Sequence, residues 1–240
     1  MNTLAVIPHY NHPDTVAGVA HALRTFGLPV LIVDDGSDVA CRARLETLDK
    51  EAGITVLYRE CNGGKGVAMK NGFRYAEANA YSHVLQVDAD AQHHLADTDK
   101  LLAAAAAAPQ AVVCGWPQYG ADAPKARLYG RKITDFWNGV HTWSADIKDG
   151  MCGFRVYPLA AVSALLASGE TVGERMDFDT EILIRLYWRG VRPVWIKTPV
   201  VYRAGGVSHF RAWADNVLIS KMHTRLFFGM LQRRFSGSVK

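Results

Sequence analysis

Short, unbroken apolar runs alternate with helical stretches through the first half of the chain. Four runs are expected to be strands: residues 4–7, 30–33, 54–58 and 83–87. The segments between them, 14–26, 38–52 and 65–80, are expected to be helices. An unbroken apolar run indicates a strand buried on both faces, and strand–helix alternation indicates a doubly wound parallel sheet. Right-handed crossovers would then bring the carboxyl ends of these strands to one edge, where such folds bind ligands.

The second half is less regular. Helices are expected over 96–108, 129–143, 177–189 and 212–234, a strand over 111–114, and a strand pair broken at Pro199 within 191–202. No internal repeat occurs, and no linker rich in Gly, Ser or Pro marks a second domain. We therefore expect one α/β domain over residues 1–211. A basic amphipathic helix within 212–240 would follow it, packed on the domain or on a membrane surface.

Composition excludes several classes of protein. The 240 residues are 49% hydrophobic and 21% charged, with a formal net charge of +4. No nucleic-acid partner is expected, because such binders carry a denser basic stripe; the mild charge suits a diphosphate or an anionic membrane surface. The four cysteines form no CxxC pair, which argues against zinc and favours the reduced thiols of a cytoplasmic protein. The chain begins without signal-peptide features, and its longest uncharged stretch, 102–121, is too weakly apolar to span a membrane.

Polar clusters follow three of the expected strands, at residues 8–11, 34–37 and 88–93. In a parallel sheet these loops lie side by side. Asp88 and Asp90 could then reach one hard divalent cation, with Gln92 adding a neutral oxygen and with water and phosphate oxygens completing the shell. For a single Asp-x-Asp the alternative is that each aspartate only ends a strand as a turn former. Three clusters in register favour a Mg²⁺ or Mn²⁺ site.

The motifs PHYN, VDDGS, NGGKG, DADAQH, GFR and YRAGGVSHF follow one another in this order. Their combination resembles the family 2 glycosyltransferases, and within them the subgroup of dolichyl- and polyprenyl-phosphate mannose synthases. The resemblance runs from Val6 to about Arg225. It implies the GT-A fold, an α/β fold with a mostly parallel central sheet flanked by helices. It also implies transfer of a sugar from a nucleotide-sugar donor.

The resemblance implies a donor site at the carboxyl edge of the sheet. The residues that would contact the nucleobase, ribose or diphosphate are Pro8, Tyr10, Val33, Asp35, Asp88 and Ala89. Asp90 and Gln92 would hold the metal, and Arg203 would neutralise diphosphate charge from the far side. His209 stands where many members carry a lysine, and His12 where many carry an acidic residue. These two departures leave the identity of the donor open.

The glycine-rich segment at residues 62–66 superficially suggests a phosphate-binding loop. It lacks the Ser or Thr that would follow the lysine, and its spacing differs. In the family, the glycines would let the backbone pass close to the nucleotide, and Lys65 would begin a helix at the donor site. A plain glycine-rich turn is the alternative.

Catalytic and acceptor residues are expected in the second half. Inverting transfer to a hydroxyl needs a base, whereas an ionised phosphate acceptor needs none. Asp179 sits where the wider family often carries its base, although it could equally belong to the polar opening of the 177–189 helix. Residues 149–155 resemble the family's D-x-x-S-G-F-R stretch and would shape the acceptor pocket through Asp149. Arg131 could bind an acceptor phosphate or form part of a solvated basic face.

We therefore expect an inverting glycosyltransferase, dependent on Mg²⁺ or Mn²⁺, that transfers one sugar to a lipid or lipid phosphate at the cytoplasmic face of a membrane. A related nucleotidyltransferase would need a basic glycine-rich loop after the first strand, and a dinucleotide-binding oxidoreductase would need GxGxxG there. The segment after the first strand, PHYNHPDT, has neither feature. A non-catalytic nucleotide- or carbohydrate-binding module is a further alternative. The tryptophans are expected in the core rather than as sugar-stacking platforms; they are Trp137, Trp143, Trp188 and Trp195.

Overall fold

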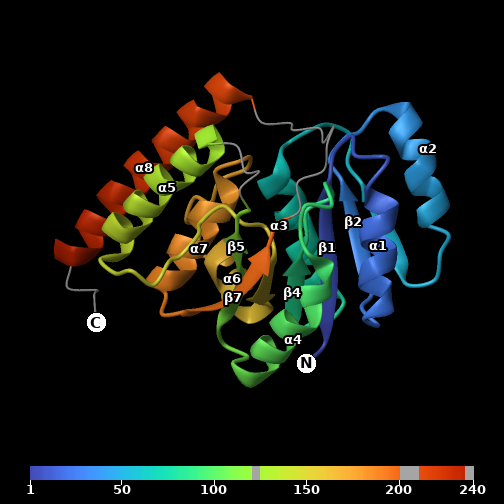
Figure 1. Cartoon of the computed structure of the whole chain (residues 1–240), viewed down its shortest axis with the longest axis horizontal. Helices are drawn as coiled ribbons and strands as arrows, with labels where there is room; N and C mark the ends of the chain where they lie inside the picture. The colour runs from blue at the N-terminus through green and yellow to red at the C-terminus, as the bar shows by residue number, and fades with distance from the viewer. Residues whose placement is uncertain (121–124, 201–210, 236–240) are drawn as a thin grey trace.

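A seven-stranded sheet forms the centre of the molecule, with helices on both faces (Figure 1). The computed structural model describes residues 1–120, 125–200 and 211–235. The sheet order is β3-β2-β1-β4-β6-β5-β7. The strands are β1 (Thr3–His9), β2 (Val30–Asp34), β3 (Ile54–Tyr58), β4 (His83–Gln86), β5 (Val112–Gln118), β6 (Arg155–Pro158) and β7 (Pro193–Pro199). Only β6 runs antiparallel to its neighbours, β4 and β5, so the expected mostly parallel sheet is confirmed.

The helices of the described chain divide between the two faces of the sheet. They are α1 (Val16–Thr25), α2 (Val39–Leu48), α3 (Lys65–Ala78), α4 (Thr98–Ala107), α5 (Lys125–Thr142), α6 (Leu159–Ala167), α7 (Phe178–Trp188) and α8 (Ala212–Phe235), with a short 3₁₀ turn, η1 (Leu95–Asp97). Buried residues of α1, α2 and α4 share one hydrophobic cluster with one face of the sheet. Those of α3, α6, α7 and α8 share another cluster with the opposite face. Strands covered on both sides explain the unbroken apolar runs of the sequence.

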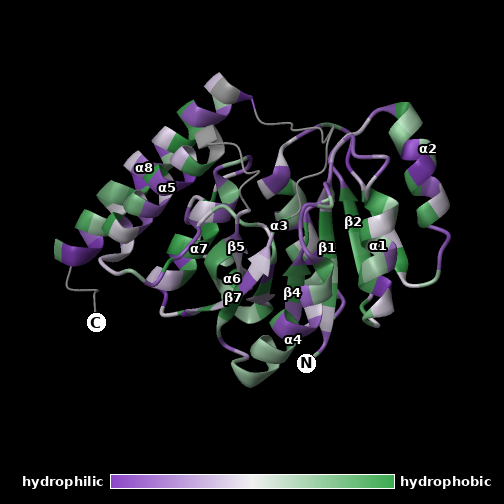
Figure 2. Cartoon of the chain, viewed as in Figure 1, coloured by the Kyte–Doolittle hydropathy of each residue, from purple (hydrophilic) through white to green (hydrophobic). Residues whose placement is uncertain are grey.

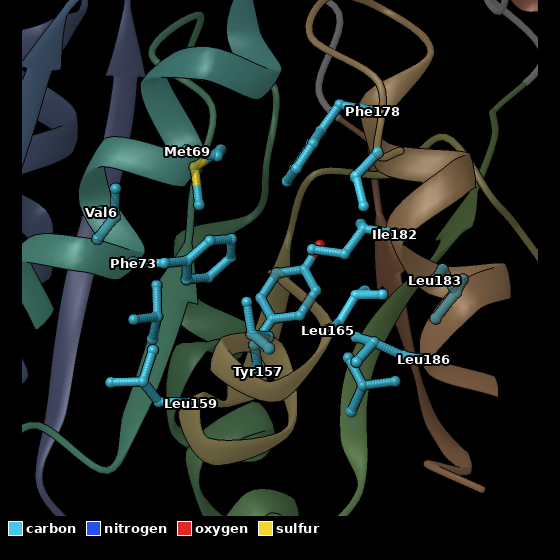
Figure 3. Close-up of a cluster of buried hydrophobic side chains, with 14 of the residues drawn as sticks. Val6, Met69, Phe73, Tyr157, Leu159, Leu165, Phe178, Ile182, Leu183 and Leu186 are labelled. Carbon is cyan, nitrogen blue, oxygen red and sulfur yellow. The ribbon is translucent and has the colours of Figure 1, made fainter. Parts of the chain in front are cut away.

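Figure 3 shows the hydrophobic cluster beneath α3, α6 and α7. Phe73 of α3 meets the ring of Tyr157 of β6 edge-on, with the ring centroids 5.4 Å apart. Phe178 and Ile182 of α7 are fully buried in the same cluster. Each such side chain contributes about 1.5–3 kcal/mol by leaving water. This packing holds the first turn of α7 close to the carboxyl edge of the sheet.

Helices α5 and α8 lie side by side on the α7 side of the molecule, at the end remote from α2 (Figure 1). Met222 and Leu226 of α8 are buried in the core, and Arg225 pairs with Glu181 of α7 at 2.5 Å. Polar and apolar residues alternate along both helices (Figure 2). Among the described residues, no helix combines the length and apolarity needed to cross a bilayer.

Two elements were not expected from the sequence, and one expected strand pair is described only in part. β6 and α6 occupy residues 155–167, which were left unassigned; β6 begins with a fully buried charged residue, Arg155, which hides a strand from hydropathy. The first strand of the pair expected over 191–202 is β7, which ends at Pro199, where the break was expected. Val200 adds only an isolated antiparallel bridge to His93, and the rest of that range lies outside the described residues.

Candidate functional site

A cavity of about 1440 Å³ opens at the carboxyl edge of the sheet. All three polar clusters noted in the sequence reach it. Among the residues on its wall are Pro8 and Tyr10 after β1, Asp35 after β2, and Asp88, Ala89, Asp90 and Gln92 after β4. Parallel pairing of β1 with β2 and with β4 produces this convergence, because it brings the three strand ends to the same edge.

Asp35 fixes the glycine-rich segment 62–66 to the end of β2. Its Oδ1 accepts a hydrogen bond from Gly63 N at 3.1 Å, and its Oδ2 accepts one from Gly64 N at 2.6 Å. The Arg59 guanidinium also pairs with Asp35 Oδ1. Asp35 is buried and lies on the cavity wall. Most of its hydrogen-bonding capacity is therefore used within the protein, which pre-organises this side of the cavity.

Lys65, at the start of α3, joins the loop after β4 to the first turn of α7 through ion pairs. Its ammonium lies 2.6 Å from Asp88 Oδ1 and 2.7 Å from Asp179 Oδ2. Burial acts to lower the pKa of Lys65, but Asp179 and Asp88 outweigh it and hold that pKa well above its usual range. Burial likewise acts to raise the pKa of Asp88, but Lys65 and His93 hold it well below its ordinary value. Lys65, Asp88 and Asp179 all lie on the cavity wall.

Gly153 and Gln86 lie against the two carboxylates that pair with Lys65: Gly153 against Asp88, and Gln86 against Asp179. A side chain at Gly153 would place its Cβ 2.5 Å from the Asp88 oxygens, so only glycine leaves room for the carboxylate. Gln86, fully buried in β4, donates from Nε2 to Asp179 Oδ1 at 2.8 Å. Asp179 is thus engaged on both oxygens, by an amide on one and an ammonium on the other. Sequence reasoning missed Gln86, because an uncharged residue inside an apolar strand gives no chemical signal.

The turn after Asp88 presents the expected metal ligands. Ala91 adopts a left-handed conformation (φ 57), and Gln92 N donates to Asp90 Oδ1 at 3.0 Å. Asp88, Asp90 and Gln92 all lie on the cavity wall. Among the described residues, however, no group of three His, Cys, Asp or Glu side chains is close enough to hold a metal ion. Two carboxylates and one amide oxygen suit a hard cation that takes most of its ligands from water and phosphate.

The segment 149–155 is organised by Asp149. Its Oδ1 accepts hydrogen bonds from Met151 N and Cys152 N, both at 2.7 Å, and its Oδ2 pairs with Arg131. Asp149 is buried and is not among the residues that line the cavity, whereas Arg131 is. The structure therefore gives Asp149 a contact that orients Arg131. Burial raises the pKa of the Cys152 thiol to about 12, so this cysteine stays protonated.

Val33 and Trp143 differ from expectation in their placement. The side chain of Val33 is fully buried in the core and absent from the cavity wall, so a contact with a base would fall to its main chain. Arg203 and His209 lie outside the described residues. Trp143 was expected in the core, but its side chain is exposed beyond the last turn of α5. Its φ of 49 turns the chain there and carries the ring outward.

The far end of the cavity is a groove between α5 and α8 with a mixed wall, which the sequence did not reveal. Its polar residues include Arg131, Thr134, Asp215, Asn216, Ser220, His223 and Thr224. Its apolar walls are Ile133 and Trp137 of α5 and Ile219 and Phe227 of α8. The Trp137 and Phe227 rings meet edge-on at 6.4 Å. The core location expected for Trp137 is therefore only partly right, since the ring also faces the groove. Helical spacing alone could have indicated the shared faces, but not that α5 and α8 lie together.

The sheet order and the likeness to solved structures show the GT-A fold. Residues 4–165 match the family described as Glycosyl transferase family 2, and the chain belongs to that family. The resemblance drawn from the motifs is thereby confirmed. This family membership supports an enzyme that transfers sugars, and it argues against the nucleotidyltransferase, oxidoreductase and non-catalytic alternatives.

Two of the relatives similar in sequence are named for mannose and a polyprenyl lipid. The chain is 27% identical over 208 residues to the polyprenol monophosphomannose synthase of Mycolicibacterium smegmatis, covering 79% of this chain and 72% of that protein. It is 28% identical over 166 residues to the undecaprenyl-phosphate mannosyltransferase of Micrococcus luteus, covering 61% and 68%. An uncharacterised protein of Methanocaldococcus jannaschii is 26% identical over 218 residues, covering 86% and 91%.

The fold resembles that of glucosyl-3-phosphoglycerate synthase from Mycobacterium tuberculosis. That enzyme in complex with Mn²⁺ and UDP-glucose superposes with a TM-score of 0.70 at 14% identity, covering 95% of this chain and 78% of that one. At this identity the likeness shows the fold alone.

Proposed function

We propose that this protein is an inverting, metal-dependent glycosyltransferase that moves one sugar from a nucleotide-sugar donor to a lipid phosphate at a membrane surface. One observation carries the proposal: a single cavity joins a polar, carboxylate-lined end to a groove between α5 and α8 whose wall includes four large apolar side chains. A nucleotide sugar suits the first end and a lipid suits the second. The names of the relatives agree with this pairing of substrates.

The donor would bind at the carboxyl edge of the sheet. Pro8, Tyr10 and the main chain near Val33 and Asp35 would border the nucleoside, with Ala89 beneath the ribose. Lys65 is a cation on the cavity wall, next to Asp88. If Asp88 and Asp90 hold a metal that binds the diphosphate, the diphosphate would lie close to this cation. Arg203 and His209 are proposed to complete the phosphate contacts. Fixed positive charge at this place would stabilise the leaving nucleoside diphosphate as its charge develops.

Mg²⁺ or Mn²⁺ is the proposed cofactor, and Asp88, Asp90 and Gln92 are the residues that would hold it. Their oxygen donors fit a hard ion, and Asp88 is already paired with Lys65 and His93. This arrangement favours an ion that arrives with the diphosphate over one held by the protein alone. When bound, the ion would supply Lewis-acid neutralisation of the departing phosphate.

The acceptor end favours an oxygen that is already ionised. Asp179 is the candidate base, yet Lys65 and Gln86 engage both of its oxygens. A phosphate acceptor needs no base, and Arg131, oriented by Asp149, is placed on the wall to bind its charge. A lipid hydroxyl would instead require Asp179 to release Lys65 and accept the proton.

Contact with a membrane is proposed through α5 and the helix within 212–240. Tyr129, Ile133 and Phe136 repeat at helical spacing on the exposed face of α5. Ile133 belongs to both this exposed face and the groove wall, so the groove opens onto an apolar surface. Basic residues nearby, such as Lys132 and Lys221, suit an anionic lipid surface. A cytoplasmic location, peripheral on the inner face of the membrane, would follow.

Thermal-shift measurements with UDP-, GDP- and dTDP-sugars, with and without Mn²⁺, test the donor and metal together. One nucleotide is expected to raise the melting temperature only with metal, and Asp90→Ala is expected to remove the gain. Incorporation of radiolabelled sugar into an extracted polyprenyl phosphate then tests the acceptor. Equal stabilisation by every nucleotide, with or without metal, would argue against the proposal.

A further inference from the structure

Glu181, in the first turn of α7, joins the C-terminal helix to a loop beside the donor end. Its carboxylate is fully buried. Arg225 of α8 donates from Nε to Oε1 at 2.9 Å and from Nη2 to Oε2 at 2.5 Å. Gly173 N donates to the same Oε2 at 2.9 Å. Arg185, one turn further along α7, also donates to Oε1, from Nη2 at 2.9 Å. A buried carboxylate with this many donors holds its partners in one geometry.

The loop that contains Gly173, residues 172–177, covers the glycine-rich segment. Val67 N donates to Glu174 O at 3.2 Å, and Lys70 Nζ donates to Val172 O at 2.7 Å. Arg175 Nη1 donates to Asn62 Oδ1 at 3.0 Å. We call residues 172–177 the covering loop.

Gly64 shows how closely the two segments meet. Its φ is +103, and a Cβ there would lie 2.6 Å from the carbonyl oxygen of Glu174. Gly64 and Gly66 are therefore explained by the approach of the covering loop, whereas a Cβ at Gly63 would meet Arg59. The position of Lys65 depends on this contact, because both the covering loop and Asp35 bind the segment around it.

We propose that Arg225 is a positioning residue for donor binding, which is an inference that rests on the proposed function. Through Glu181 it holds the covering loop, and the covering loop holds Lys65 and Asn62 on the donor side of the cavity. Arg225 itself is not among the residues that line this cavity. The packing of α8 against the domain is thereby linked to the affinity for the nucleotide at the donor end of the cavity.

The variant Arg225→Gln separates this role from folding. Glu181 keeps Arg185 as a cationic partner when Arg225 is removed, so no buried charge is left alone. Arg225→Lys restores the charge. Arg233→Gln is the matched control, because Arg233 lies on the same helix and donates to Trp188 O at 2.6 Å, at the far end of α7 from the covering loop.

Titration calorimetry with UDP, GDP and dTDP, each with Mn²⁺, measures the effect, alongside amide hydrogen exchange. For whichever nucleotide the wild type binds, Arg225→Gln is expected to weaken affinity about tenfold. The amides of residues 173–175 should exchange faster in this variant. Arg225→Lys should recover most of the affinity, and Arg233→Gln should retain wild-type affinity even if its melting temperature falls.

Two results would overturn the role of Arg225. One is wild-type affinity in Arg225→Gln; the other is an equal loss of affinity in Arg225→Gln and Arg233→Gln, which would mean that binding only follows stability. Either leaves the proposed function intact. A wild-type protein that binds none of UDP, GDP and dTDP would defeat the proposed function and this role together.

Discussion

The ammonium of Lys65 lies 2.7 Å from Asp179, which places a residue of α3 and a residue of α7 in direct ionic contact across the cavity. Asp88 completes the arrangement at 2.6 Å from the same ammonium. One cation therefore keeps two partly buried carboxylates together that would otherwise repel each other. The cluster has consequences for both stability and binding.

Lys65→Met is expected to destabilise the fold by about 3 kcal/mol at pH 7, because it leaves Asp88 and Asp179 without their shared cation. Adding Asp179→Asn should recover part of that loss, since one of the two charges is removed. Urea unfolding of the single and double variants measures both effects. A double variant no more stable than Lys65→Met would contradict the coupling.

Asp135 should make the protein less stable as the pH rises. Burial and the nearby Asp149 carboxylate raise its pKa to about 7, from an ordinary value of 3.8. The folded state then binds more protons than the unfolded chain between these values, so stability is lost as the pH rises through this interval. Asp135→Asn should stabilise the protein at pH 8 by on the order of 1–2 kcal/mol, after allowing for screening by water. Denaturant unfolding at pH 8 and pH 4.5 checks this, with little difference expected at the lower pH.

A buried histidine pair should weaken the contact between α5 and α8 in acid. His141 Nε2 and His223 Nδ1 lie 3.0 Å apart, and burial lowers the pKa of each to about 4. Their ordinary value is 6.5, so the unfolded chain binds more protons between pH 6.5 and 4. The stability contributed by the neutral pair is present above pH 6.5 and lost as the pH falls toward 4. Unfolding measured across this range should show a slope that His141→Gln reduces; equal slopes would refute the assignment.

Phe136 should contribute to membrane contact. Its side chain is 66% exposed on α5, beside Ile133 at the groove. Phe136→Glu is expected to reduce co-sedimentation with phosphatidylglycerol vesicles several-fold, without a fall in melting temperature. Val39→Glu is the control, because Val39 is 86% exposed on α2, remote from α5 in Figure 1. Equal effects of the two variants would count against a defined membrane surface, and a change in oligomeric state would indicate a protein partner instead.

The first half of the fold follows from the sequence because its strands are covered on both faces. Residues such as Ile7, Ile32 and Leu85 lie in continuous apolar runs, and their burial leaves little choice of structure. β6 escaped prediction for the opposite reason. Arg155 is fully buried but donates to Asp179 O at 2.6 Å and Gly150 O at 2.8 Å, partners that no local pattern reveals.

The site could be predicted in its location but not in its internal pairing. Asp35, Asp88 and Asp90 follow strand ends, so topology alone brings them to one edge. The attachment of Asp35 to Gly63 and Gly64, and of Lys65 to Asp179, depends on how distant loops pack. The groove between α5 and α8 could not be predicted for a similar reason. The sequence reveals the apolar face of each helix, but it does not reveal that the two helices lie together.

The reversed direction of β6 gives the cavity a kind of wall that a uniformly parallel sheet lacks. Parallel strands deliver to this edge only segments that are leaving the sheet. Because β6 starts where they finish, the peptide at Gly153 meets Asp88 as the chain enters the sheet rather than as it leaves. Changes in the loop ahead of β6 can therefore reshape this part of the cavity wall while the ends of β1, β2 and β4 keep their places in the sheet.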